Sequence, residues 1–162
     1  MAEESIFTKK EIKFLKELTK NKVEFILVGL AAATLQGAPV VTQDIDLWFK
    51  NLQDPNLQKA LKAVKGGYIE PIMLNPPMFY GDNIKMFDIV VTLSGLEDFN
   101  TELKNTTEIK LEGCSVKILK LERIIKSKKT ANRKKDQLSV PVLEDTLATL
   151  KTLNKKRADT SS

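Results

Sequence analysis

The alternation of apolar and polar positions along the chain predicts a mixture of strands and helices. Apolar runs of four to eight residues bounded by turn residues are typical of strands. Such runs predict strands at 24–28, 40–49 and 85–93, and a hairpin at 107–119. Residues 68–84 contain three prolines and a glycine, so we expect a loop or an irregular edge strand there.

Helical periodicity alternates with these strands. Apolar residues at every third or fourth position predict amphipathic helices, and the T-x-x-E pattern at Thr8 and Glu11 is a capping box at a helix start. The predicted helices are 8–20, 31–35, 54–64, 96–104, 121–129 and 136–153. We therefore predict an α/β (α+β) fold in which helices flank a mixed β-sheet.

The order of these elements divides the chain into a core and an appendage. We predict a core at 1–119 and a helical C-terminal extension at 120–155 that packs on the core, with no flexible linker between them. A polar tail at 156–162 is predicted to be frayed.

Length and composition place the chain among ordinary globular proteins. It has 162 residues, of which 42% are hydrophobic and 29% charged, and no apolar run approaches the roughly 20 residues of a membrane helix. The polar, acidic N-terminus is unlike a secretory signal, and Cys114, the only cysteine, cannot form an internal disulfide. We therefore expect a cytoplasmic protein that has no membrane partner.

The chain contains no histidine, which narrows the chemistry that it can perform. Ser-His-Asp and Cys-His catalysis, histidine-ligated zinc and histidine acid–base steps are all excluded. Catalysis would have to come from carboxylates, lysines, hydroxyls, backbone amides or a hard metal ion held by oxygen atoms.

Basic residues are concentrated in one segment. The net charge is +5, yet residues 120–136 alone contain eight basic and two acidic side chains, a surplus that exceeds that of the whole chain. This pattern predicts either a solvated helix face or a surface that faces the phosphates of a nucleotide or a nucleic acid.

Three aspartates lie in the predicted strands. Asp44 and Asp46 alternate along 40–49 and therefore share one face, with Cα atoms roughly 7 Å apart. Asp88 lies amid an apolar run, where a charge is costly unless something compensates it. If the two strands are neighbours, three carboxylates converge, which suits a pair of divalent metal ions. The alternative is that these are surface aspartates at strand ends.

Gly29 separates the strand at 24–28 from a helix of small residues. A helix that begins there would direct backbone amides at an anion, although the glycine could also serve only as a strand-to-helix turn.

Together these residues resemble a known family. The order strand, Gly29, helix, Gly37, Pro39, Thr42, Asp44, Ile45, Asp46 resembles the minimal nucleotidyltransferases of the DNA polymerase β superfamily, and especially small bacterial proteins related to AbiEii-type toxins. The segment with Lys128, Arg133, Lys135 and Asp136 is similar to the helical element that follows the core in that family. The resemblance spans roughly residues 23–145 and implies a nucleotidyltransferase-like mixed sheet.

The resemblance also implies an activity, the transfer of a nucleoside monophosphate from an NTP to a hydroxyl of an unknown acceptor, which could be a small molecule, a protein or RNA. Three aspartates would be catalytic and would bind Mg²⁺ or Mn²⁺: Asp44, Asp46 and Asp88. Six residues would bind the nucleotide: Gly29, Leu30, Thr42, Lys128, Arg133 and Lys135. Asp136 would orient one of the basic residues or cap the last helix.

Two residues depart from the family pattern. Leu30 stands where a second small residue is usual, and Val40 stands where an arginine is frequent. The alternative hypothesis is therefore a catalytically degenerate binding protein with this fold, within a toxin–antitoxin pair. A third hypothesis is nucleic-acid binding through residues 120–135. A homodimer or a protein partner would complete the cleft, of which 162 residues supply only a part.

Overall fold

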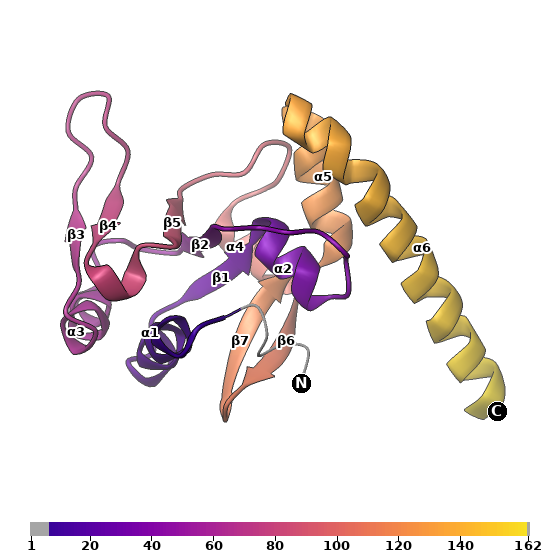
Figure 1. Ribbon diagram of the computed structural model, residues 1–162, viewed down its shortest axis with the longest axis horizontal. Helices are drawn as coiled ribbons and strands as arrows, with labels where there is room; N and C mark the ends of the chain where they lie inside the picture. The colour runs from indigo at the N-terminus through magenta and orange to yellow at the C-terminus, as the bar shows by residue number, and fades with distance from the viewer. Residues whose placement is uncertain (1–6, 162) are drawn as a thin grey trace.

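The computed structural model describes residues 7–161 and is built on a mixed five-stranded sheet (Figure 1). Its strand order is β5-β2-β1-β7-β6, with β1/β2 and β6/β7 antiparallel and β2/β5 and β1/β7 parallel. The strands are β1 (Phe25–Val28), β2 (Ile45–Phe49), β5 (Phe87–Val90), β6 (Thr106–Leu111) and β7 (Cys114–Leu119). The predicted mixed α/β fold is confirmed.

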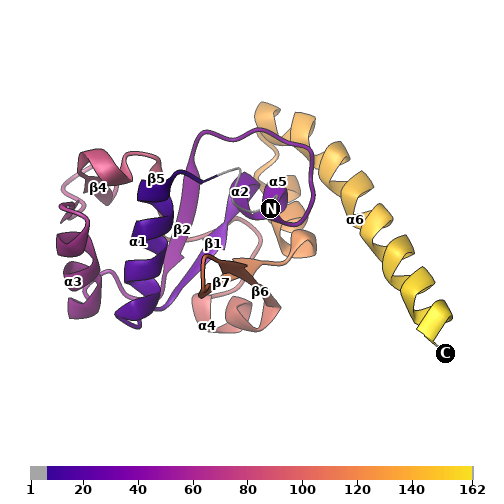
Figure 2. The same ribbon diagram turned by 60° about the horizontal axis from the view of Figure 1, so that its bottom comes forward.

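Helices cover both faces of this sheet and one of its ends (Figure 2). They are α1 (Lys9–Lys20), α2 (Gly29–Leu35), α3 (Pro55–Ala63), α4 (Phe99–Glu102), α5 (Leu121–Ala131) and α6 (Lys134–Ser161), with 3-10 turns η2 (Asp82–Ile84) and η3 (Leu103–Asn105). The Phe14 ring of α1 packs edge-on against Phe87 of β5 at 4.9 Å. On the opposite face, Trp48 of β2 packs against Phe99 of α4 at 5.7 Å.

The predicted start of α1 is confirmed in detail. The Glu11 amide donates to Thr8 Oγ1 at 3.2 Å and the Thr8 amide donates to Glu11 Oε1 at 2.9 Å, which completes the capping box. Because this cap fixes where the helix begins, the apolar stripe that includes Phe14 turns toward the sheet.

The strand predicted at 40–49 is shorter in the structure, where β2 begins at Ile45. β1 ends opposite Asp46, and the pairing with β5 begins at Ile45, so residues 40–44 have no neighbouring strand to complete a hydrogen-bond ladder. They form an irregular loop instead. In the same way, the strand predicted at 85–93 is paired only over Phe87–Val90.

Residues 67–80 form a small second sheet, the edge strands that the prolines predicted. β3 (Gly67–Ile69) and β4 (Met78–Tyr80) pair antiparallel. The hairpin stands clear of the main sheet on one side of the molecule (Figure 1).

The C-terminal extension consists of α5 and the long helix α6. α5 contacts α2 and buries Leu121, Ile124 and Ile125. Among its described residues, α6 fully buries only two apolar side chains, Val140 and Leu143, before it projects away from the core (Figure 1). The predicted tail at 156–162 is helical over its described residues, because its lysine, arginine and alanine favour helix and no glycine or proline interrupts it.

Two features bear on where the protein is found. The acidic N-terminal segment lies outside the described residues. Among residues 7–161, no helix is long and apolar enough to span a membrane.

Candidate active site

The parallel pairing of β2 and β5 brings two of the predicted aspartates side by side. Asp46 is the register partner of Asp88, so both side chains leave the same face of the sheet. Both line a cavity of about 820 Å³, and Asp44, in the loop before β2, lines it as well. Asp44, Asp46 and Asp88, whose proximity the sequence left conditional, therefore line one cavity.

Each of the two strand aspartates is electrostatically perturbed. Burial, followed by the charges of Asp88 and Asp44, raises the pKa of Asp46, while Lys128 and Lys135 oppose that rise. Partial desolvation at the cavity wall and then the Asp44 charge raise the pKa of Asp88. Burial is the larger cause of both shifts and the neighbouring carboxylate charges add to it, and a bound cation would favour the deprotonated forms.

The side chains that line the cavity have the chemistry to bind a hard cation, although they are not arranged as a metal site. The cavity offers carboxylate oxygens, the ligands that Mg²⁺ and Mn²⁺ prefer, and no histidine or cysteine. Within residues 7–161, no group of three or more histidine, cysteine, aspartate or glutamate side chains is close enough together to hold a metal ion.

Gly29 lies against Asp46 at the junction of β1 and α2. Its φ is +70°, a conformation that favours glycine, and a Cβ placed there would lie 2.5 Å from Asp46 Oδ2. The glycine therefore leaves room for the Asp46 carboxylate, a steric role distinct from the phosphate contact that the sequence predicted. The next residue, Leu30, is half-buried and lines the cavity.

Thr42 also lines the cavity, but its hydroxyl is engaged with the backbone of Asp44. It donates to the Asp44 carbonyl at 2.9 Å and accepts from the Asp44 amide at 3.3 Å. Thr42 therefore shapes the loop that carries Asp44 into the cavity.

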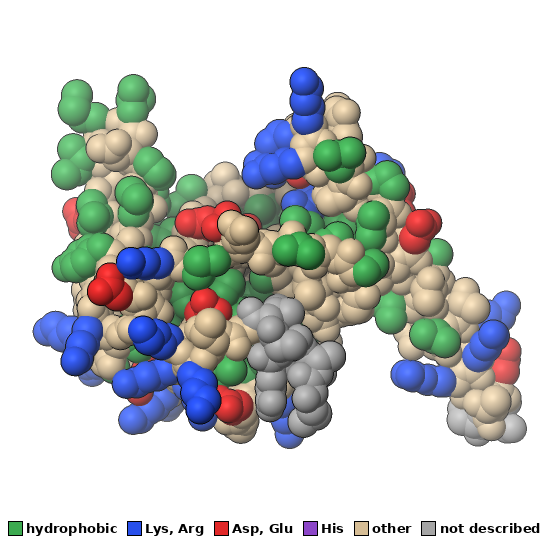
Figure 3. Space-filling model, viewed as in Figure 1, with side chains coloured by type: hydrophobic (Ala, Val, Ile, Leu, Met, Phe, Trp, Pro, Cys, Tyr) green, Lys and Arg blue, Asp and Glu red, His purple; other side chains and the backbone are tan. Residues whose placement is uncertain are grey.

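The opposite wall of the cavity is basic and comes from the C-terminal extension. Lys128, Arg133, Lys135 and Asp136 all line it. α5 is followed by its C-cap Asn132, which adopts the left-handed conformation (φ 51°), and α6 begins two residues later. This sharp turn brings residues of both helix ends to the cavity. Figure 3 shows acidic side chains between the β3–β4 hairpin and the basic α5–α6 junction.

Asp136 organises this basic wall. It is 1% exposed and accepts from Arg133 Nε at 2.8 Å, from Arg133 Nη2 at 3.2 Å and from the Arg133 amide at 3.1 Å. Lys128 Nζ lies 3.5 Å from Asp136 Oδ1. Asp136 thus both caps α6 and orients two basic residues, which covers both roles that we expected for it.

The charges in this cluster are tuned by one another. Burial would raise the pKa of Asp136, but the hydrogen bonds from Arg133 and the charge of Lys128 lower it overall. Burial lowers the pKa of Lys128 against the opposing effect of Asp136. Because Lys128 also feels the charge of Asp46, it links the basic wall to the acidic one.

No pattern in the sequence predicted the third wall, which is formed by residues 91–94 after β5 and by Ser127. Gly95 (φ +73°) lets this loop lie against Thr130 of α5, because a Cβ there would collide with the Thr130 hydroxyl. An isolated glycine after a strand predicts only a turn, so this contact could not be anticipated.

Aromatic residues near the aspartates along the chain lie outside the cavity. Trp48 is 3% exposed and packs against Phe99, and Phe79 packs edge-on against Phe14 and Phe49. Both therefore serve packing, the interpretation that ordinary protein cores favour.

Comparisons with known proteins identify the fold. No protein-family model and no curated protein sequence matches the chain. A crystal structure of ANT(2″)-Ia in complex with adenylyl-2″-tobramycin is 17% identical, with a TM-score of 0.56, over 92% of this chain and 94% of that one. The solution structure of the antibiotic-resistance factor ANT(2″)-Ia is 15% identical, with a TM-score of 0.58, over 99% and 96%.

A third similar structure is an antigenic nucleotidyltransferase-like protein from Paracoccidioides brasiliensis, 16% identical, with a TM-score of 0.53, over 96% of this chain and 92% of that one. All three match nearly the full length of this chain. The protein therefore has the nucleotidyltransferase fold, as the sequence resemblance implied.

Proposed function

We propose that the protein is a metal-dependent nucleotidyltransferase that transfers a nucleoside monophosphate from an NTP to a hydroxyl of an acceptor. The observation that carries this proposal is the register pairing of Asp46 with Asp88 in a cavity whose opposite wall is basic. A triphosphate needs both halves, carboxylates to hold its metal ions and cations to neutralise the remaining charge.

Asp44, Asp46 and Asp88 would hold Mg²⁺ or Mn²⁺, which when bound would neutralise triphosphate charge and favour ionisation of the acceptor hydroxyl. The fit rests on their oxygen donors and on the neighbouring carboxylate charges, which add to burial in raising the pKa values of Asp46 and Asp88. The three side chains are not close enough to hold an ion as they stand, so the exposed Asp44, in its loop, would have to turn toward the other two.

The basic wall would bind the triphosphate. Lys128, Arg133 and Lys135 face the cavity from two helix ends, and the guanidinium fork of Arg133 suits phosphate oxygens. Asp136 itself would not contact the nucleotide. It is a positioning residue that fixes Arg133 and Lys128 while the phosphates occupy the space in front of them.

The reaction would proceed by in-line displacement at phosphorus. The acceptor oxygen forms a bond to the α-phosphorus while the bond from that phosphorus to the α,β-bridging oxygen breaks. Pyrophosphate leaves with the bonding electron pair, and the hydroxyl proton passes to a carboxylate oxygen of Asp88.

Two measurements test this function. Calorimetry with Mg²⁺ and a non-hydrolysable ATP should give saturable heat for the wild type and none for Asp46→Asn. Transfer of α-labelled NTP to candidate acceptors should fall by on the order of 10²–10⁴-fold in Asp88→Asn, the range of a general base. Asp145→Asn, exposed on α6, is the matched control. Transfer that is unchanged in Asp46→Asn would overturn the assignment.

The second candidate is a binding protein on the same fold that no longer transfers nucleotides, within a toxin–antitoxin pair. Leu30 favours it, because this large side chain lines the cavity at the position where the family has a small residue. This candidate predicts no heat with Mg²⁺ and ATP analogue in the wild type and measurable heat in Leu30→Ser. Tight binding by the wild type would count against it.

A further inference from the structure

The hairpin formed by β3 and β4 exposes an unusual concentration of apolar side chains. We name residues 69–80 the apolar prong. Met73 is 98% exposed and Leu74 is 100% exposed. The prong's other exposed large apolar side chains are Ile69, Ile72, Met78 and Tyr80. Figure 3 shows these side chains gathered on one projection, away from the cavity walls of α5 and α6.

The prong is firmly attached at its base. Phe79 turns inward and packs edge-on against Phe14 at 5.6 Å and Phe49 at 5.7 Å. These two contacts tie β4 to the core, so the exposed side chains stand on an anchored support. Six exposed large apolar side chains gathered on one projection are the kind of surface patch that marks an interaction site on a globular protein.

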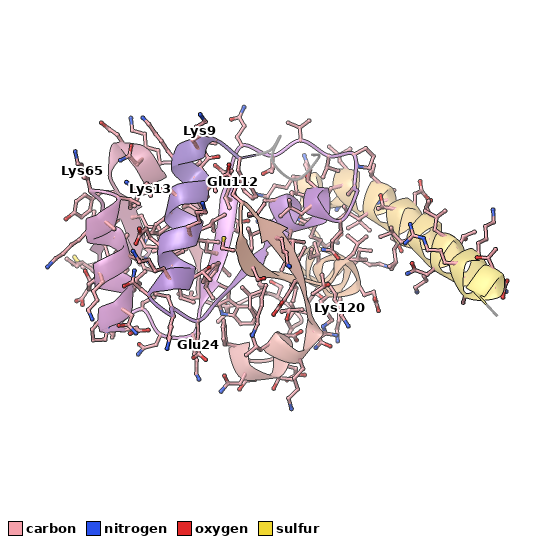
Figure 4. The ribbon with its side chains drawn as sticks, turned by 90° about the horizontal axis from the view of Figure 1, so that it is seen from below. Lys9, Lys13, Glu24, Lys65, Glu112 and Lys120 are labelled. Atoms are coloured by element: carbon pink, nitrogen blue, oxygen red, sulfur yellow. The ribbon has the colours of Figure 1, made fainter. Side chains whose placement is uncertain are left out.

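The prong is also the part of the chain with the least charge. Residues 66–81 contain a single charged side chain, Glu70, in a protein whose residues are 29% charged. The body behind the prong is rich in lysines, including Lys65 next to β3 and Lys9 and Lys13 on α1 (Figure 4). A different protein that bound this basic surface would present acidic side chains to the lysines. The prong itself has no basic side chain with which such acidic groups could pair.

We propose that the apolar prong is the interface of a symmetric homodimer, in which the prong of one copy packs against the prong of a second. A twofold contact needs a surface that complements itself, and an apolar, nearly uncharged patch does so without bringing like charges together.

The projection of the prong also separates the two basic bodies. From Ile69 to Met73 an extended chain spans up to roughly 13 Å. That exceeds the screening length of about 8 Å at physiological ionic strength. Contact through the prongs therefore brings apolar side chains together while the lysine-rich surfaces stay beyond the range of strong repulsion.

The contact uses side chains rather than a continuous strand ladder. Pro71, Pro76 and Pro77 lie in the loop of the prong, and proline has no amide hydrogen to donate. The interface is therefore governed by the apolar side chains at the tip, and substitutions there should weaken it without disturbing the backbone.

The test is the mass of the full chain in solution, measured by sedimentation velocity over a range of concentrations. The wild type should sediment at about twice 18.2 kDa. The double variant Met73→Ser/Leu74→Ser should dimerise at least 100-fold more weakly and sediment as a monomer, with an unchanged circular dichroism spectrum. Leu138→Ser, which replaces an 80% exposed apolar residue on α6, is the matched control and should remain dimeric.

Three outcomes would overturn the proposal. A wild type that is monomeric at several hundred micromolar, a double variant as dimeric as the wild type, or a dimer that dissociates when NaCl is raised to 1 M would each do so. Binding of the ATP analogue should be the same in the wild type and the double variant. A failure of nucleotide binding would thus reject the proposed function and leave the dimer untouched.

Discussion

Two buried carboxylates tie the C-terminal extension together, and their different surroundings show how similar chemistry serves structure or site. Glu102 on α4 is fully buried and accepts from Arg123 of α5, from the Glu97 amide at 2.9 Å and from Asn105 Nδ2 at 3.2 Å. Asp136 is equally buried and also accepts from an arginine, but its oxygens lie at the cavity.

The two carboxylates differ in whether the basic side chain that each one binds can also contact a ligand in the cavity. Arg123 forms an ion pair with Glu102 and does not line the cavity. In contrast, 55% of the Arg133 side chain is exposed, and Lys128 lines the cavity. Glu102 therefore holds α5 to the core, and Asp136 holds cations in position for a ligand. Substituting each carboxylate by its amide separates these two roles.

The largest effect on stability is expected from Glu102→Gln. The amide cannot neutralise Arg123, whose side chain keeps 23% exposure, so the free energy of unfolding should fall by about 3 kcal/mol, the lower end for a broken buried pair. Urea denaturation measures it. Glu108→Gln, exposed on β6, should change stability by no more than about 0.5 kcal/mol. Equal losses in both variants would contradict the assignment.

A smaller loss of stability but a larger loss of binding is expected from Asp136→Asn. Because Arg133 is largely hydrated, stability should fall by about 1–2 kcal/mol. Misplacement of Lys128 and Arg133 should weaken binding of Mg²⁺ and ATP analogue by about 10–100-fold, as calorimetry would show. Tighter binding would mean instead that Asp136 withholds these cations from the ligand. At a temperature at which Glu102→Gln is still folded, this variant should bind the analogue as tightly as the wild type.

The smallest effect is a pH dependence. Hydrogen bonds from Arg123 hold the pKa of Glu102 below its ordinary value of 4.5. A lowered folded pKa adds stability that is present above the unfolded value and is lost as the pH falls through the folded one. The unfolding free energies of wild type and Glu102→Gln should therefore differ at pH 7, and the difference should shrink as the pH falls below 4.5 and through the lowered pKa of folded Glu102. Parallel curves across this range would exclude the ion pair as the cause.

Local patterns predicted those parts of the fold that depend on neighbours in the chain. The hairpin at 107–119 and the capping box at Thr8 need only a few adjacent residues, and both appear as expected. The strand at 40–49 was predicted too long because its length is set by partners, β1 and β5, that no local pattern specifies. The third wall of the cavity was missed for the same reason, since Gly95 meets α5 only through tertiary packing.

The sequence by itself determined that Asp46 and Asp88 would lie on strand faces and that a basic segment would follow them, because side-chain alternation and charge are local properties. Only the tertiary structure decided that β2 and β5 are parallel neighbours, so that Asp46 meets Asp88, and that the Asn132 turn brings the basic helix ends opposite them. Strand order and helix docking depend on which surfaces bury one another across the whole chain, and a linear pattern does not contain that information.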